Sequence, residues 1–250
     1  MSKHNPLKKL LSFIFTPIHF FVFSLILIIF HPIQWICLKL GGYKWHKRSV
    51  DVMNLLLTKS LLFNGTSCHF INKQNLPTDR PLILVANHNS LYDIAPFFWY
   101  LRKHHVKFIS KIELGHGIPS VSFNLRHGGS VLIDRKNQRQ SIPALKNFAQ
   151  YLEQKNYAGV IFPEGTRSRT GQPKPFSQTG LKILIKYAPS AFVIPVSINN
   201  TWKLHRYGKF PLSFGERLTW KVHPPIDPSQ GSMDEILAKI ETTVRSGIKI

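Results

Sequence analysis

The chain has 250 residues, with 33 Lys and Arg against 12 Asp and Glu, which gives a net charge of +21 at pH 7. This length fits one substantial α/β domain with an additional segment and is too short for two domains of ordinary size. The positive charge indicates an anionic partner: nucleic acid, an acidic membrane surface, or a phosphorylated substrate with an acidic carrier. With only Cys37 and Cys68, the sequence excludes a disulfide framework and a cysteine-built zinc site.

The N-terminal region contains an apolar segment of membrane-spanning length. Residues 10–30 have no charged side chain apart from a protonatable His19, and their number matches the hydrocarbon thickness of a bilayer. Basic residues flank the segment on both sides, so the positive-inside rule selects no orientation. We therefore predict a membrane-anchoring helical hairpin over residues 1–48, turning near His31-Pro32 with both flanks on the cytoplasmic face. A single span is the alternative.

Residues 49–250 are predicted to form one α/β domain. Apolar periodicity and turn signals predict strands at 66–71, 81–86, 106–110, 130–133, 158–162, 191–198 and 217–222, and helices at 50–63, 90–103, 138–155, 177–187 and 233–248. A glycine-punctuated loop is expected over 111–119. Strands that alternate with helices in this way predict a central, mostly parallel sheet flanked by helices.

Polar side chains follow three of these predicted strands. His88 and Asp93 follow the strand at 81–86, Arg135 follows the strand at 130–133, and the stretch PEGTR, ending in Arg167, follows the strand at 158–162. The carboxyl ends of parallel strands share one edge of a sheet, so these groups are expected to meet there. Each group alone also has an ordinary structural interpretation, as a hydrogen-bonded histidine, a solvated charge or a turn.

The spacing of His88 and Asp93 favours a base and its orienting partner. An imidazole has an unperturbed pKa of about 6.5 and can accept a proton near neutral pH, and Asp93 is the nearest carboxylate that could orient the ring. Partners on one face of a helix lie three or four residues apart, whereas these lie five apart. We therefore expect His88 in a strand-to-helix turn and Asp93 one turn into the helix.

Four stretches carry a resemblance to a known family. NHNSLYD, GGSVLIDR, FPEGTRS and VIPVSI, in this order over residues 80–198, resemble the four sequence blocks of the glycerolipid acyltransferase family typified by 1-acyl-sn-glycerol-3-phosphate acyltransferase, also called lysophosphatidic acid acyltransferase. The resemblance implies an enzyme that transfers a fatty acyl group to the sn-2 hydroxyl of 1-acyl-sn-glycerol 3-phosphate, giving phosphatidic acid in phospholipid biosynthesis. The acyl donor would be acyl-CoA or acyl carrier protein, with no further cofactor and no metal.

The same resemblance implies roles for individual residues. His88 would be the general base and Asp93 its partner. The acceptor's phosphate site would be formed by Glu164, Gly165, Thr166 and Arg167, with Lys111 and Arg135 as basic positions near it. His116, Arg169 and Lys174 match no block. An acyl-enzyme on Ser90 is the minor alternative, because no G-x-S-x-G nucleophile elbow surrounds that serine.

Rival interpretations remain open on the sequence alone. A nucleic-acid-binding protein would explain the charge, but the chain has no recognisable nucleic-acid-binding motif and carries a long apolar segment. A non-catalytic membrane protein could use the same site to bind an anionic lipid, and a family member could act on another lysolipid. The expected location is the bacterial inner membrane, with the active site facing the cytoplasm and an anionic membrane surface as partner.

Overall fold

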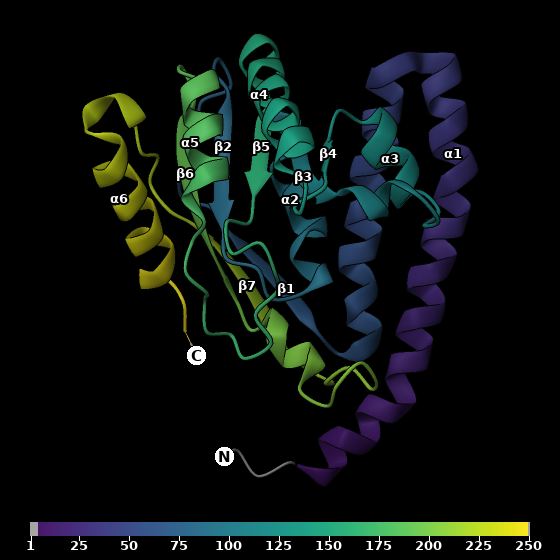
Figure 1. The fold of residues 1–250 in the computed structure, drawn as a ribbon. Coiled ribbons are helices and arrows are strands. Elements are labelled where there is room, and N and C mark those ends of the chain that lie inside the picture. Colours follow the sequence, from purple (N-terminus) through teal and green to yellow (C-terminus); the bar gives the residue numbers. More distant parts are fainter. Residues whose placement is uncertain (1–4, 250) are drawn as a thin grey trace.

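A seven-stranded sheet forms the centre of the protein in the computed structural model, which describes residues 5–249 (Figure 1). The strand order is β1-β7-β6-β2-β5-β3-β4. The strands are β1 (Ser67–Ile71), β2 (Leu82–Ala86), β3 (Lys107–Lys111), β4 (Val131–Ile133), β5 (Ala158–Ile161), β6 (Phe192–Asn199) and β7 (Arg217–Val222). β6 pairs with β7 antiparallel, and the other pairs are parallel. The predicted mostly parallel α/β sheet is therefore confirmed.

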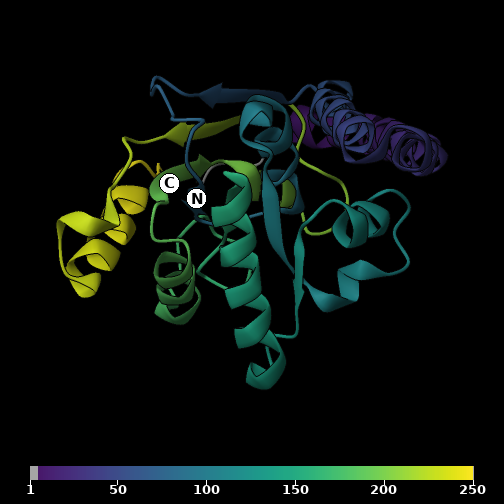
Figure 2. The same ribbon diagram turned by 90° about the horizontal axis from the view of Figure 1, so that it is seen from above.

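Both faces of the sheet are covered, which places β2 in the middle of the core. Leu82 and Leu84 join a cluster with α2 (Ala95–Tyr100) on one face, whereas Ile83 and Val85 join a cluster with three helices on the other face. Those helices are α4 (Gln138–Lys155), α5 (Gln178–Tyr187) and α6 (Met233–Ser246), seen together on one side of the sheet in Figure 2. The sequence of a strand that is buried on both faces is an uninterrupted apolar run, because no position along the strand faces water.

The N-terminal helix α1 (Pro6–Ser60) folds back on itself as two arms, which lie side by side in Figure 1. The backbone leaves helical geometry at Gly42, with φ 60° and ψ −155°. The expectation of a turn near His31-Pro32 was therefore wrong. Helix continues through Pro32, whose ring costs one backbone hydrogen bond, whereas the reversal requires a conformation that is essentially restricted to glycine.

The first arm presents a broad apolar surface outward. Its exposed large side chains are Leu7, Leu10, Phe13, Ile14, Ile18, Phe20, Phe21, Leu25, Ile28, Ile29, Trp35, Ile36 and Leu40. Within residues 5–249, α1 is the one helix long and apolar enough to cross a membrane. Leu27 and Phe30 of the first arm pack against Met53 and Leu57 of the second. The apolar helix fits membrane association, while its inner face is part of the protein's own packing.

The second arm extends beyond the predicted end of the hairpin. It reaches Ser60 without interruption and then passes through a short 3₁₀ turn, η1 (Leu61–Asn64), into β1. Residue 48 lies inside this arm. The division of the chain into an anchor over residues 1–48 and a domain over residues 49–250 stays a prediction.

Two regions between strands differ from the predicted elements. The helix expected over 90–103 is divided into η2 (Leu91–Asp93), α2 and η3 (Arg102–His104). Pro96, in the first turn of α2, explains the first break, because proline has no backbone N–H with which to continue the hydrogen bonding of η2. Helix α3 (Val121–His127) was not predicted and follows η4 (Ile112–Gly115). The remaining 3₁₀ turns are η5 (Thr201–His205) and η6 (Pro228–Gln230).

The glycine at the hairpin reversal gives a stability test. Gly42→Ala should lower the free energy of unfolding by about 1–3 kcal/mol, because alanine is strained in this backbone conformation. Chemical denaturation of the detergent-solubilised protein measures this change, with Lys44→Ala, an exposed position two residues further on, as the control. Equal stability of Gly42→Ala and the wild type would show that the reversal does not depend on glycine.

Candidate active site

His88 and Asp93 meet directly after β2. The Nδ1 atom of His88 lies 2.8 Å from Oδ2 of Asp93. The same oxygen accepts hydrogen bonds from the backbone amides of Asn89 at 2.6 Å and Ser90 at 2.8 Å. An ionised carboxylate only accepts hydrogen bonds, so Nδ1 carries a hydrogen, and in the neutral ring Nε2 then has the lone pair. The predicted pairing of these two side chains is present in the structure.

The turn that carries the pair is fixed by local capping. Ser90 is the N-cap of η2: its hydroxyl accepts from the amide of Tyr92, and the Asp93 carboxylate accepts from the amide of Ser90. This reciprocal capping box satisfies donors that would otherwise be orphaned at the start of the turn. Asp93 therefore lies in a 3₁₀ turn and not one turn into a long helix. From β7, the indole of Trp220 donates to the backbone carbonyl of Asp93 at 3.1 Å.

Glu164, which follows β5, holds the backbone of the same turn. Its Oε1 accepts from the amide of His88 at 2.8 Å, and its Oε2 accepts from the amide of Lys174 at 2.8 Å. The side chain is buried, and burial raises its pKa, an effect that these two amide bonds oppose. Both oxygens are thus committed to backbone donors, which favours an organising role. A direct contribution of Glu164 to a phosphate site stays a prediction.

The loop from Gly165 to Arg167 lies beside the pair. Gly165 has a φ of 69°, in the left-handed region that favours glycine. Thr166 and Arg167 are exposed, and Lys174 Nζ donates to Thr166 Oγ1 at 2.6 Å and to the carbonyl of Arg167 at 3.3 Å. The loop is also joined to the turn that carries His88, because the amide following Arg167 donates to the carbonyl of His88 at 2.8 Å. Lys174, which matched no sequence block, supports this loop.

Lys111 and Arg135 lie further along the same edge of the sheet. Lys111 ends β3, where it is paired with Ile133 of β4, and Arg135 follows two residues later. Both are exposed. In the strand order, β3 and β4 are two and three strands from β2, which at about 4.8 Å per strand means offsets of about 10 and 14 Å. These basic residues therefore lie on the same edge of the sheet but two and three strands away from the His88–Asp93 pair.

His205, at the end of η5, is a site residue that the sequence did not indicate. Its Nε2 lies 3.1 Å from the Ser90 hydroxyl. Burial and the positive charge of Arg167 lower the pKa of His205, while the carbonyl of Gly208 and the charge of Asp93 oppose that shift. The ring is therefore within electrostatic reach of both Asp93 and Arg167. No motif singles out this position, because its contacts depend on β6 lying beside β2.

Among the described residues, no three His, Cys, Asp or Glu side chains lie in an arrangement that could hold a metal ion. Both cysteines are free thiols.

Comparison with known proteins places this arrangement in a family. Residues 67–199, more than half of the chain, match the family described as Acyltransferase. A 1-acyl-sn-glycerol-3-phosphate acyltransferase of Helicobacter pylori strain J99 is 37% identical over 134 residues, covering 50% of this chain and 54% of that protein. One from Chlamydomonas reinhardtii is 28% identical over 179 residues, covering 71% and 52%. The chain thus spans about half the length of these relatives.

A solved structure extends the similarity to nearly the whole chain. The crystal structure of the 1-acyl-sn-glycerophosphate (LPA) acyltransferase PlsC from Thermotoga maritima superposes with a TM-score of 0.76 at 26% identity, covering 97% of this chain and 95% of that one. The sheet, the N-terminal apolar helix and the edge that carries His88 thus belong to one shared fold. The matched region contains the His88–Asp93 turn and the Glu164 loop, and the chain belongs to the acyltransferase family.

Proposed function

We propose that this protein transfers a fatty acyl group from a thioester donor, acyl-CoA or acyl carrier protein, to the sn-2 hydroxyl of 1-acyl-sn-glycerol 3-phosphate. The observation that carries the proposal is the 2.8 Å contact between His88 Nδ1 and Asp93 Oδ2 beside an exposed arginine loop. Relatives named for this reaction support the choice of acceptor. The product would be phosphatidic acid.

His88 would act as the general base through Nε2. With Nδ1–H donated to Asp93, the lone pair on Nε2 can take the proton of the acceptor hydroxyl as its oxygen attacks the thioester carbonyl carbon. Asp93 would hold the tautomer and stabilise the imidazolium that forms. A carbon–oxygen bond forms, the carbon–sulfur bond breaks, and the proton on His88 passes to the departing thiolate. This sequence requires neither a metal nor a covalent acyl-enzyme.

Ser90 is a poor nucleophile in this arrangement. Its residue has no exposed surface, and its hydroxyl faces His205 instead of the free nitrogen of His88. A serine that attacks a thioester has to reach the carbonyl carbon and be activated by a base whose proton can then be passed on. Burial of Ser90 therefore supports direct transfer to the acceptor over the acyl-enzyme route.

Arg167 is proposed to bind the acceptor's phosphate. Its guanidinium is exposed next to the catalytic turn, and a planar guanidinium can bond a phosphate monoester in bidentate fashion. Gly165 and Thr166 would shape the loop, and Lys111 and Arg135 would add positive potential along the edge of the sheet. The acidic partners implied by the net charge of +21 are then the lysolipid, the donor and the membrane surface.

The outward apolar face of α1 supports a membrane location for this chemistry. Both substrates would carry long acyl chains, so an enzyme docked at the bilayer meets them where they partition. We place the protein at a bacterial inner membrane with the site facing the cytoplasm and anionic lipid beneath it. A non-catalytic anionic-lipid-binding protein is the rival function, and loss of turnover on mutation of the base distinguishes the two.

Substitution of the proposed base tests catalysis directly. His88→Ala should lower kcat by about 10²–10⁴-fold while lysolipid binding is retained, because only proton transfer is removed. Turnover is measured with purified protein, a panel of lysolipids and both donor types, alongside binding of lysophosphatidate. His116→Ala, an exposed histidine, is the control. Unchanged acyl transfer by His88→Ala would refute this mechanism.

Substitution of Arg167 tests the phosphate assignment. Arg167→Ala should raise the KM for lysophosphatidate by about 10–100-fold, because a charge-assisted contact is worth about 1.5–3 kcal/mol, and should leave the KM for the donor nearly unchanged. Arg169→Ala is a matched control, since Arg169 is exposed in the same loop. Equal increases for acceptor and donor would show that Arg167 does not discriminate the acceptor.

A further inference from the structure

Three polar side chains on the first arm of α1 point away from its apolar surface. Ser12, Thr16 and His19 are spaced as on one helix face, and each has no exposed area. A polar residue in an otherwise apolar segment is costly to bury unless it is hydrogen-bonded, and such residues mark functional contacts. All three side chains form hydrogen bonds with the α/β domain or with the helical segment that leads into it. The helix face that carries them is therefore the contact surface between the arm and the α/β domain.

His19 reaches the catalytic turn itself. Its Nε2 lies 2.9 Å from the hydroxyl of Tyr92, and its Nδ1 lies 3.0 Å from the carbonyl of Ser60. A carbonyl only accepts, so Nδ1 carries the hydrogen and Nε2 of the neutral ring accepts from Tyr92. Tyr92 immediately precedes Asp93 in η2. One hydrogen bond therefore joins the apolar arm to the residue before the proposed orienting acid.

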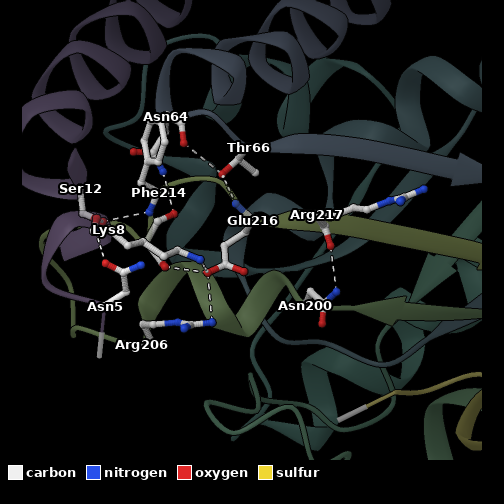
Figure 3. A network of polar contacts seen from close by, with 11 residues as sticks. Asn5, Lys8, Ser12, Asn64, Thr66, Asn200, Arg206, Phe214, Glu216 and Arg217 are labelled. Carbon is white, nitrogen blue, oxygen red and sulfur yellow. Dashed lines mark hydrogen bonds and ion pairs between the residues drawn. The ribbon is translucent and has the colours of Figure 1, made fainter. Parts of the chain in front are cut away.

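A second connection passes through residues 201–216, which we call the bridging segment. Ser12 Oγ accepts from the Phe214 amide at 2.9 Å, and Thr16 Oγ1 accepts from the Leu212 amide at 3.0 Å. Figure 3 shows Lys8 and Arg206 directed at the carboxylate of Glu216, at 2.8 and 3.0 Å. Glu216 is buried, so this carboxylate at the end of the bridging segment is a paired charge that joins the segment to Lys8 of the arm.

The other end of the bridging segment holds Ser90. His205 Nε2 lies 3.1 Å from the Ser90 hydroxyl. A neutral ring with its hydrogen on Nδ1 accepts the hydroxyl hydrogen of Ser90 at Nε2. The amide of Ser90 is in turn one of the three donors to Asp93 Oδ2. The bridging segment thus connects the arm to the oxygen that orients His88.

We propose that the N-terminal hairpin positions the catalytic pair as well as anchoring the protein, through the His19–Tyr92 and His205–Ser90 hydrogen bonds. The inference rests on the proposed acyl transfer. The two bonds hold Ser90 and Tyr92, the residues on either side of Leu91 in the turn that ends at Asp93. They are positioning contacts, because neither His19 nor His205 is assigned contact with the reacting atoms. A hairpin displaced from the domain would release the turn at both points.

The sharpest test removes one hydroxyl. Tyr92→Phe deletes the partner of His19 and keeps the ring, and it should lower kcat about tenfold with the KM of each substrate within twofold of wild type. Tyr100→Phe in α2, whose ring stacks on Phe70, is the matched control and should keep wild-type kcat. Sedimentation with vesicles containing anionic lipid should stay complete for both variants, because the apolar face of the arm is unchanged.

A double-mutant cycle separates positioning from general destabilisation. If the hydroxyl acts through Asp93, Tyr92→Phe should change kcat by less than twofold in an Asp93→Asn background. Destabilisation of the whole domain would reduce kcat equally in both backgrounds. The second bond is tested with His205→Leu, expected to lower kcat about tenfold, and His205→Gln, expected to restore most of it because the amide can still bond Ser90.

Each outcome decides the proposal. Tenfold loss in Tyr92→Phe that disappears in the Asp93→Asn background supports the positioning role. Wild-type kcat in Tyr92→Phe and His205→Leu, or equal losses in both backgrounds, would overturn it while leaving the proposed function standing. Absence of wild-type turnover with every lysolipid and donor would overturn the proposed function, and the positioning role with it.

Discussion

The carboxylate of Asp93 is the interaction on which the site depends. It has no exposed surface, and a buried charge is strongly unfavourable unless hydrogen-bond donors replace the water it has lost. Its Oδ2 receives the ring of His88 and two consecutive backbone amides. The chain can supply those amides only by turning tightly after β2, so the turn itself provides the donors for Oδ2. Oδ1 has no hydrogen-bond partner among the described residues.

A second buried carboxylate constrains the turn from the neighbouring strand. Glu164 accepts from the His88 amide, and the loop that follows returns a bond to the His88 carbonyl. The backbone of His88 is thus held on both sides by the segment after β5, which pairs with β2 in parallel. Displacement of either strand would leave a buried acceptor or donor without its partner, at a cost of about 1–3 kcal/mol for each group. The backbone of His88 is therefore anchored to the centre of the sheet.

The sheet and the edge that carries the site were predictable from the sequence, because apolar runs and turn residues are local features of the chain. The apolar run of β2 and the alternation of strands with helices predicted the parallel sheet, and the polar residues at strand ends predicted which groups share an edge. The order of strands then determines which of these groups touch: Glu164 meets His88 across adjacent strands, whereas Arg135 lies three strands away. Strand order is a long-range property that spacing along the chain does not reveal.

The position of the hairpin turn and the role of His205 were not predicted, because they depend on backbone conformation and on contacts between distant residues. The sequence predicts a hairpin turn near His31-Pro32, but the helix continues through this proline, and the reversal depends on the positive φ of Gly42. His205 was missed because its partner, Ser90, lies 115 residues away. The phosphate-site role that the resemblance gives to Glu164 stays a prediction, whereas its bond to the His88 amide depends on β5 lying beside β2.

The central claim is that Asp93 holds His88 with hydrogen on Nδ1 and a lone pair on Nε2. Nitrogen-15 NMR of histidine-labelled protein in detergent, with the His88 signals identified by their loss in His88→Gln, measures the tautomer directly. At a pH where the ring is neutral, the account predicts a protonated Nδ1 and an unprotonated Nε2 in the wild type, and a loss of this preference in Asp93→Asn. A wild-type ring protonated at Nε2 would contradict it.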